Sequence, residues 1–452
     1  MAGSSALHPS GCRWHPATRV AFRFLFVYVL LYSWGAVLQL IPFVGGIGPS
    51  AIEESMYPVF VAIGRAVFGV EITVFPNGSG DTTFNWVQVA THVVVALVAA
   101  AAWTALDRKS VAYPRLKDGL WIAMRFVLAS AMLGYGLDKV FLLQFPAPAM
   151  QRLMQPYGES SPMGLLWTFI GASEPYQFFA GTMEVVGGML LLFRITQLAG
   201  ALWCAGVMAN VVLLNFCFDV PVKLYSSHLL LMALVIAAPD LPRLVRMFVL
   251  NRGAEPVDLA GPWTDMRWRR IARVVKWSWI ALTVPLLVWQ MYGARAMYGP
   301  DAPKGALDGT WEVAEFWRDG VDVPPLTTDA ARWRYCTMID RPEFKIATVT
   351  RMPGASDRWF LVLLDERGSR VESSAAKGKL ELHEWSVAAG DDPAKAKVIA
   401  TLDYALQDDG WLRVAGDFAG ARIEALCARK QAGDYLLVNR GFHWINETPF
   451  NR

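Results

Sequence analysis

Charged residues are scarce in this chain, where Asp, Glu, Lys and Arg together make up 18% of 452 residues. Globular chains average about 25%. Hydrophobic residues make up 54%, and the mean hydropathy is +0.31. The shortage of charge is uneven, because long apolar runs fill residues 1–299 while residues 300–452 resemble a soluble domain. We therefore expect a membrane domain over 1–299 and a separate domain over 300–452.

The motifs of several enzyme classes are also missing. The five cysteines form no Cys-x-x-Cys pair and have no adjacent histidine, so no metal site is predicted. There is no nucleophile triad and no nucleotide-binding loop, which argues against hydrolases, kinases and nicotinamide enzymes. The net charge of +3 follows from basic membrane-flanking loops, so no nucleic-acid partner is expected.

Apolar runs of about 17 to 25 residues predict membrane spans. Seven such runs lie near 24–44, 84–106, 119–137, 175–193, 197–216, 224–239 and 277–297. The segment 56–74 is interrupted by Arg65 and Glu71, which favours an interfacial or re-entrant helix over an eighth span.

The distribution of basic residues predicts the orientation. With a cytoplasmic N-terminus, the inner segments contain sixteen Lys and Arg and the outer loops contain four. Seven spans then place 300–452 outside the inner membrane of a bacterium, whereas an eighth span would place it in the cytoplasm. The first apolar run has no small-x-small cleavage pattern, so it is interpreted as a signal anchor.

Residues 135–251 contain a series of short motifs. They include Lys139-Val-Phe-Leu-Leu-Gln-Phe-Pro, Glu184-Val-Val-Gly-Gly and Asn215-Phe-Cys-Phe-Asp-Val-Pro-Val-Lys. This block resembles the DoxX family of four-helix bacterial membrane proteins. The resemblance implies a helical core over 119–250, an inner-membrane location and an association with quinone-linked oxidoreductase subunits. A weaker resemblance is to the HTTM bundle of vitamin K-dependent carboxylase-like proteins, but no carboxylase motif supports it.

Two ionisable residues lie inside predicted spans, where charge is costly and marks function or a packing pair. Arg125 and Glu184 are predicted at depths that let them meet. Glu184 shares a helix face with Ala180 and Gly188, so it should point into the bundle. Such a pair either fixes helix packing or binds quinone and relays protons.

A second polar cluster is predicted at the outer ends of the spans. Asp138 and Lys139 end the third span, Glu174 begins the fourth, and Asn215, Asp219, Lys223 and His228 bracket the turn between the fifth and sixth. Carboxylates, a lysine and a histidine can bind a polar head group or move a proton. The alternative is that loop ends simply tolerate charge.

The candidates divide by role. The catalytic candidates are Glu184, Arg125, Asp219, Lys223 and His228, and the cofactor-binding candidates are Asn215, Asp138, Lys139 and Tyr135. A haem between His92 and His228 is not expected, because these histidines lack the paired spacing of haem bundles. Cys336 and Cys427 lie in predicted strands where a disulfide is permitted, and their pairing stays open.

Residues 309–452 change to period-two alternation. Strands are predicted at 310–316, 332–339, 344–350, 358–364, 379–385, 397–406, 411–418, 422–427 and 435–438, with hairpin turns at Asp319-Gly320, Arg367-Gly368 and Asp409-Gly410. This predicts a small antiparallel barrel or sandwich. Gly309-Thr-Trp311 resembles the start of lipocalin-type barrels, which implies that Arg440 covers Trp311 and that the barrel either holds a lipophilic ligand or is filled. The aromatic tail from Arg440 is expected to plug the barrel or pack on the membrane.

Together these patterns predict a multi-pass bacterial inner-membrane protein with a redox-associated role. Its expected ligand is a membrane quinone or a small lipophilic molecule, and its expected partners are the lipid bilayer and a membrane redox subunit. The alternative is a non-enzymatic anchor or scaffold whose β domain binds a lipid or a partner protein.

Overall fold

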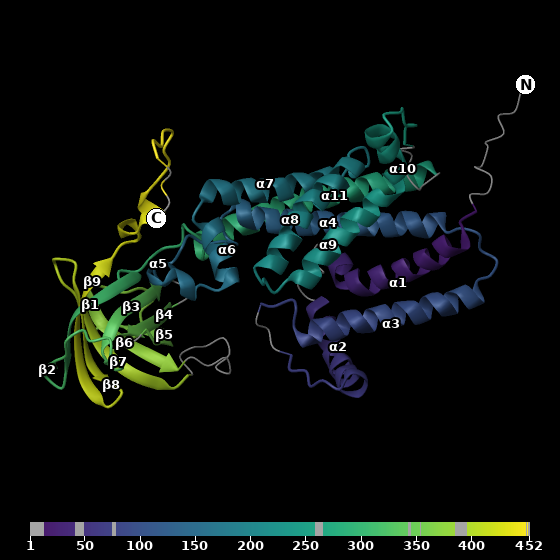
Figure 1. Ribbon diagram of the computed structural model, residues 1–452. Coiled ribbons are helices and arrows are strands. Elements are labelled where there is room, and N and C mark those ends of the chain that lie inside the picture. The colour runs from purple at the N-terminus through teal and green to yellow at the C-terminus, as the bar shows by residue number, and fades with distance from the viewer. Residues whose placement is uncertain are drawn as a thin grey trace, which may run out of the picture. The chain divides into compact units, whose positions relative to one another are not determined.

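The computed structural model describes residues 13–40, 49–74, 78–257, 265–341, 345–352, 354–384, 396–448 and 450. The chain divides into two compact units (Figure 1). The first comprises Met1–Val140 and Tyr176–Gln290 and is helical. The second comprises Phe141–Pro175 and Met291–Arg452 and contains the β-strands.

The helical unit is built from α-helices, most of which are long and apolar. They are α1 (Pro16–Gln39), α2 (Pro49–Ile63), α3 (Thr83–Leu106), α4 (Pro114–Val140), α7 (Glu174–Leu191), α8 (Gln197–Cys217), α9 (Lys223–Ala237), α10 (Leu241–Leu244) and α11 (Met266–Met297). Six helical segments are long and apolar enough to cross a membrane: α1, α3, α4, α8, α11 and the segment Lys223–Val249 that begins with α9. The chain is therefore a membrane protein by the length and composition of its helices.

These six segments coincide with six of the seven predicted spans. The seventh prediction, 175–193, corresponds to α7, which is a helix of 18 residues but is not among the six. Because α7 has only 18 residues, its polar side chains, including Gln177 and Glu184, all fall within the one stretch of that length that it offers. The segment predicted as interfacial, 56–74, contains the second half of α2 and a π-helical turn, Gly64–Phe68, which ends at Gly69 in the left-handed region.

Close packing in the helical unit depends on glycines in α4 and α7. A Cβ atom on Gly181 would lie 2.5 Å from the carbonyl oxygen of Gly136, and one on Gly188 would lie 3.0 Å from that of Ala129. The two helices therefore run against each other backbone to backbone, as the small residues around Glu184 predict.

The second unit contains an eight-stranded barrel. Its strands are β1 (Gly309–Arg318), β3 (Trp333–Asp340), β4 (Lys345–Arg351), β5 (Ser356–Leu364), β6 (Lys377–Glu384), β7 (Val398–Leu406), β8 (Leu412–Phe418) and β9 (Ala421–Lys430). Each strand pairs antiparallel with the next, and β1 pairs with β9, which closes the sheet. The short strand β2 (Val321–Asp322) folds back on β1 through Asp319 and Gly320, both at positive φ. Of the two predicted folds, barrel and sandwich, the structure has the barrel.

The barrel interior is packed with large side chains. Trp311, Phe316 and Leu412 are fully buried, and Trp333 is 2% exposed. A pocket of about 300 Å³ at one end of the barrel is lined by residues that include Arg318, Trp333 and Phe418. The interior is therefore largely filled, and the pocket is confined to that end.

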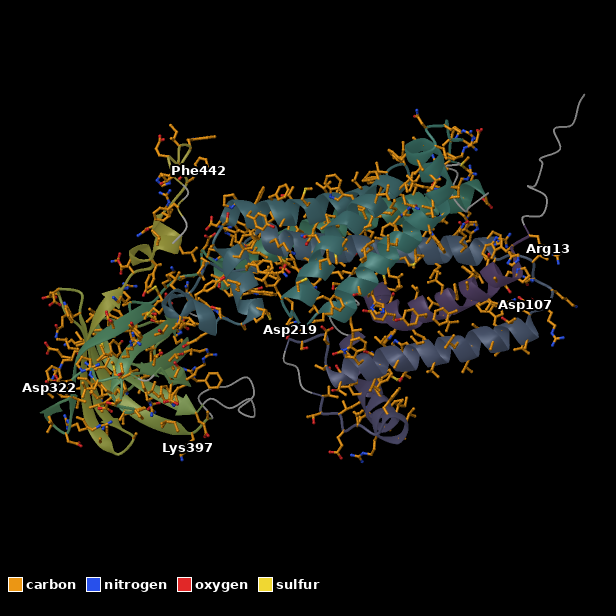
Figure 2. All side chains as sticks on the ribbon, in the orientation of Figure 1. Arg13, Asp107, Asp219, Asp322, Lys397 and Phe442 are labelled. Carbon is orange, nitrogen blue, oxygen red and sulfur yellow. The ribbon has the colours of Figure 1, made fainter. Side chains whose placement is uncertain are left out.

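Three details of the β domain differ from expectation. Residues 435–438 do not form a strand, because this segment contains the helical turn α12 (Leu436–Asn439). The guanidinium over Trp311 belongs to Arg429, 5.4 Å from the ring centroid, whereas Arg440 lies over Phe450. The described residues of the tail do not plug the barrel, since Trp444 is 91% exposed and Phe442 lies outside the barrel (Figure 2).

The two barrel cysteines are free thiols in this structure. Cys336 and Cys427 are both buried, and a hydrogen bond between their side chains, together with burial, raises the pKa of the Cys336 thiol well above its ordinary value. A thiol in this state reacts slowly, because the thiolate is the nucleophile.

Candidate functional site

A buried ion pair joins α4 and α7. Lys139 Nζ lies 2.8 Å from Glu184 Oε2, and the two residues are 8% and 4% exposed. The close approach of Gly136 and Gly181 brings the helices near enough for this contact. The structure thus joins a predicted catalytic candidate, Glu184, to a predicted cofactor-binding candidate, Lys139.

The predicted pairing of Arg125 with Glu184 is wrong. Arg125 Nη1 donates instead to Gln197 Oε1 at 2.8 Å. The prediction failed because Gly181 packs against Gly136, which brings Glu184 beside Lys139 and leaves Arg125 about three turns from Gly136 along α4. α4 also continues to Val140, beyond the expected end at residue 137. Lys139 therefore lies within the helix and is buried rather than at a solvated span end.

Two tyrosines adjoin the ion pair. Lys139 Nζ lies 5.8 Å from the ring centroid of Tyr135, and the rings of Tyr135 and Tyr225 are 6.0 Å apart. Tyr135 is 42% exposed, so its ring lies at the surface of the helical unit beside the pair. Asp138, the neighbour of Lys139 in the chain, is half-buried.

His228 forms a second part of the cluster with two tyrosines of α1. Its ring stacks on Tyr32 with centroids 3.8 Å apart, and Nε2 lies 2.6 Å from Tyr28 Oη. Nδ1 lies 2.6 Å from the carbonyl oxygen of Leu224, which can only accept, so Nδ1 carries the proton and Nε2 accepts from Tyr28. Both ring nitrogens are therefore engaged in hydrogen bonds.

A cavity of about 20 Å³ adjoins this group, and its lining includes Tyr28, Tyr32 and His228. A cavity of that size holds one water molecule. His92, the other histidine in a span, is 7% exposed, and its Nδ1 has no hydrogen-bond partner among the described residues.

The polar turn between α8 and α9 is organised by a residue that sequence reasoning missed. Asp81 accepts hydrogen bonds from the backbone nitrogens of Lys223 at 2.7 Å and Leu224 at 2.9 Å, at the start of α9. Lys223 Nζ lies 2.8 Å from Asp219 Oδ1 and 3.9 Å from Asp81 Oδ2. A carboxylate here stabilises the exposed amides at the N-terminus of the helix.

Asn215 has a structural partner in the same region. Its Nδ2 atom donates to Ser226 Oγ at 3.0 Å, and this contact joins α8 to α9. Glu174, another residue predicted for this polar cluster, belongs to the second unit.

Sequence reasoning also missed Arg23, a buried arginine of α1 that contacts the C-terminal end of α3. Arg23 Nη1 donates to Thr104 Oγ1, and Nε donates to Tyr113 Oη. Asp107 follows α3, and hydrogen bonds from Ser110 and Tyr113 lower its pKa to about 2. Figure 2 shows Asp107 at one end of α3 and Asp219 near the other.

The described cluster combines a buried ion pair, tyrosine hydroxyls and a histidine in an apolar helical unit. The fold and this site define a polytopic membrane protein that carries an eight-stranded barrel domain. The chain is 32% identical over 134 residues to the protein YwoB of Bacillus subtilis (strain 168), which is described as uncharacterized. The match covers 30% of this chain and 82% of YwoB, so the chain belongs to the same family as YwoB. No family model and no solved structure matches the chain.

Proposed function

We propose that this protein is a DoxX-like membrane protein that binds a quinone, or a small lipophilic molecule with a similar polar head, beside the Lys139–Glu184 pair. The observation that carries the proposal is that this buried ion pair lies next to the partly exposed ring of Tyr135. Ionisable groups within membrane helices are rare, and they commonly mark ligand or proton pathways.

The chemistry of the pair suits a quinone head group. Lys139 Nζ donates to Glu184 Oε2 at 2.8 Å and makes a longer contact of 3.5 Å to the carbonyl oxygen of Tyr135. A carbonyl oxygen of the ligand that replaces this longer contact would accept from the same ammonium. Tyr135 and Tyr225 offer aromatic faces on which a planar ring can stack. We propose that a bound quinol is oxidised to the quinone, with its two electrons passing to a membrane redox subunit that serves as the oxidant. Of the two protons released, Glu184 is placed to accept one, and the other passes to water.

We further propose seven spans in a bacterial inner membrane, with the N-terminus in the cytoplasm and the barrel outside. Packing supports counting α7 as a span, because it runs along α4 through Gly181 and Gly188. Its 18 residues extend about 27 Å, close to the thickness of the hydrocarbon core. The excess of Lys and Arg in the inner segments supports the orientation.

The test measures the binding of decylubiquinone to the full chain in lipid nanodiscs. Binding is monitored through the quenching of tryptophan fluorescence. We expect saturable binding by the unaltered chain and at least a roughly tenfold weaker Kd for the double variant Glu184→Gln/Lys139→Met. The double change removes both charges together and so avoids leaving one of them unpaired.

The matched control is Glu424→Gln, which removes a carboxylate from the exposed Arg413–Glu424 pair of the barrel. Equal binding by the control and the unaltered chain is expected. Binding that survives the double change unaltered would contradict this site, and a chain that does not bind quinone at all would favour the anchor or scaffold role.

A further inference from the structure

Four cations gather around one end of α8 in the helical unit. They are Arg125 on α4, Arg194 in the turn before α8, and Arg273 and Lys276 on α11. Arg125 Nη1 donates to Gln197, three residues after Arg194, and Lys276 Nζ lies 5.2 Å from the ring centroid of Phe193, the residue before Arg194. Arg273 precedes Lys276 by about one turn of α11. The four positive charges thus form one cluster, which we call the α11 cation cluster.

No carboxylate among the described residues forms an ion pair with any member of this cluster. Arg125 is 8% exposed, and its Nε atom is buried without a hydrogen-bond partner in the described part of the chain. Lys276 Nζ lies 5.2 Å from the ring centroids of Phe193 and of Trp277. Arg125 is the buried member of the cluster, whereas Arg194 and Arg273 are exposed. A buried cation is costly unless an anion compensates it.

An apolar groove begins beside the cluster. It has a volume of about 430 Å³, and its lining includes Ile122 and Phe126 of α4 and Val275 and Trp279 of α11. Lys276 is its basic lining residue, and the Arg125 guanidinium lies 5.5 Å from the ring centroid of Phe126. The groove and the cations are therefore parts of one surface.

We propose that this surface binds one anionic phospholipid, with its phosphate on the α11 cation cluster and an acyl chain in the groove. Charge complementarity favours this occupant, because basic pockets between membrane helices suit anionic head groups. A zwitterionic lipid has no net charge with which to compensate the cluster. The apolar groove excludes a small free anion as the full occupant, since such an ion would leave the groove empty.

The experiment is native mass spectrometry of the delipidated full chain, titrated with phosphatidylglycerol or with phosphatidylcholine of the same acyl chains. We expect one phosphatidylglycerol to bind at least roughly tenfold more tightly than phosphatidylcholine. Lys276→Gln should weaken phosphatidylglycerol binding by roughly fivefold, because it removes one basic contact. The matched control is Lys117→Gln, which removes a basic residue of α4 outside the cluster and should leave binding unchanged.

A second variant tests the groove without altering charge. Ala272 is another lining residue, and Ala272→Leu should fill part of the groove and weaken phosphatidylglycerol binding while all four cations remain. Equal affinity for the two lipids would overturn the proposal. So would inorganic phosphate that binds as tightly as phosphatidylglycerol, since the acyl chain in the groove would then contribute nothing to binding.

Discussion

At the scale of single residues, the Lys139–Glu184 pair is the most consequential contact in the helical unit. Both side chains are buried, with side-chain exposures of 10% and 5%, so each depends on the other for compensation of its charge. Buried pairs add little net stability compared with apolar residues, but removing one partner alone is strongly destabilising.

We therefore predict that Lys139→Met alone lowers the free energy of unfolding by about 3 to 5 kcal/mol, because Glu184 is left as an uncompensated buried charge. Glu184→Gln should have a similar effect, and the double variant should recover part of the loss. The measurement is thermal unfolding in detergent, with the fraction of protein that stays monodisperse as the readout. Two single variants as stable as the parent would show that the pair is not buried from water as the structure describes.

The sequence indicated that Glu184 is important but not which residue it contacts. Its burial followed from the small residues on its helix face. Its partner depended on where α4 ends, and helix ends are the least certain part of a hydropathy reading. Tyr28 and Tyr32 were missed for a related reason, since aromatic residues inside an apolar run give no separate periodic signal.

At the scale of elements, the contact between α4 and α7 rests on glycine. We predict that Gly181→Leu destabilises the helical unit by at least about 2 kcal/mol, because its side chain would meet the backbone of Gly136 and Val140. The control is Gly206→Leu on α8, where a Cβ atom would meet nothing within 4 Å. Thermal unfolding of both variants checks this, and similar midpoints would contradict the close packing of the two helices.

Strand positions were largely predictable, because alternation identifies one buried face. Leu412 and Val414 of β8 are buried while Arg413 between them is exposed, as a period of two requires. Residues 435–438 were mistaken for a strand because four mostly apolar residues fit a short strand and a helical turn equally well. Arg429 was overlooked as the cover of Trp311 because the registration of β1 and β9 is not encoded locally.

At the scale of the whole molecule, the number of spans determines on which side of the membrane the barrel lies. We predict that alkaline phosphatase fused after Arg452 is active, and that a green fluorescent protein fusion at the same position is dark when exported by the general secretory route. This follows from seven spans with a cytoplasmic N-terminus. A bright fluorescent fusion together with an inactive phosphatase would place the barrel in the cytoplasm, and α7 or the segment 56–74 would then have to be reassigned.

The closure of the barrel by β1 and β9 has a consequence for how the chain is made. β1 is synthesised first and gains its β9 partner only after all the other strands have emerged from the ribosome. During that interval one edge of the growing sheet is open to pairing with other chains. A chain terminated before Ala421 would therefore have an open sheet with unpaired strand edges in place of a smaller barrel. Pairing of the last strand removes those edges and with them a site of aggregation.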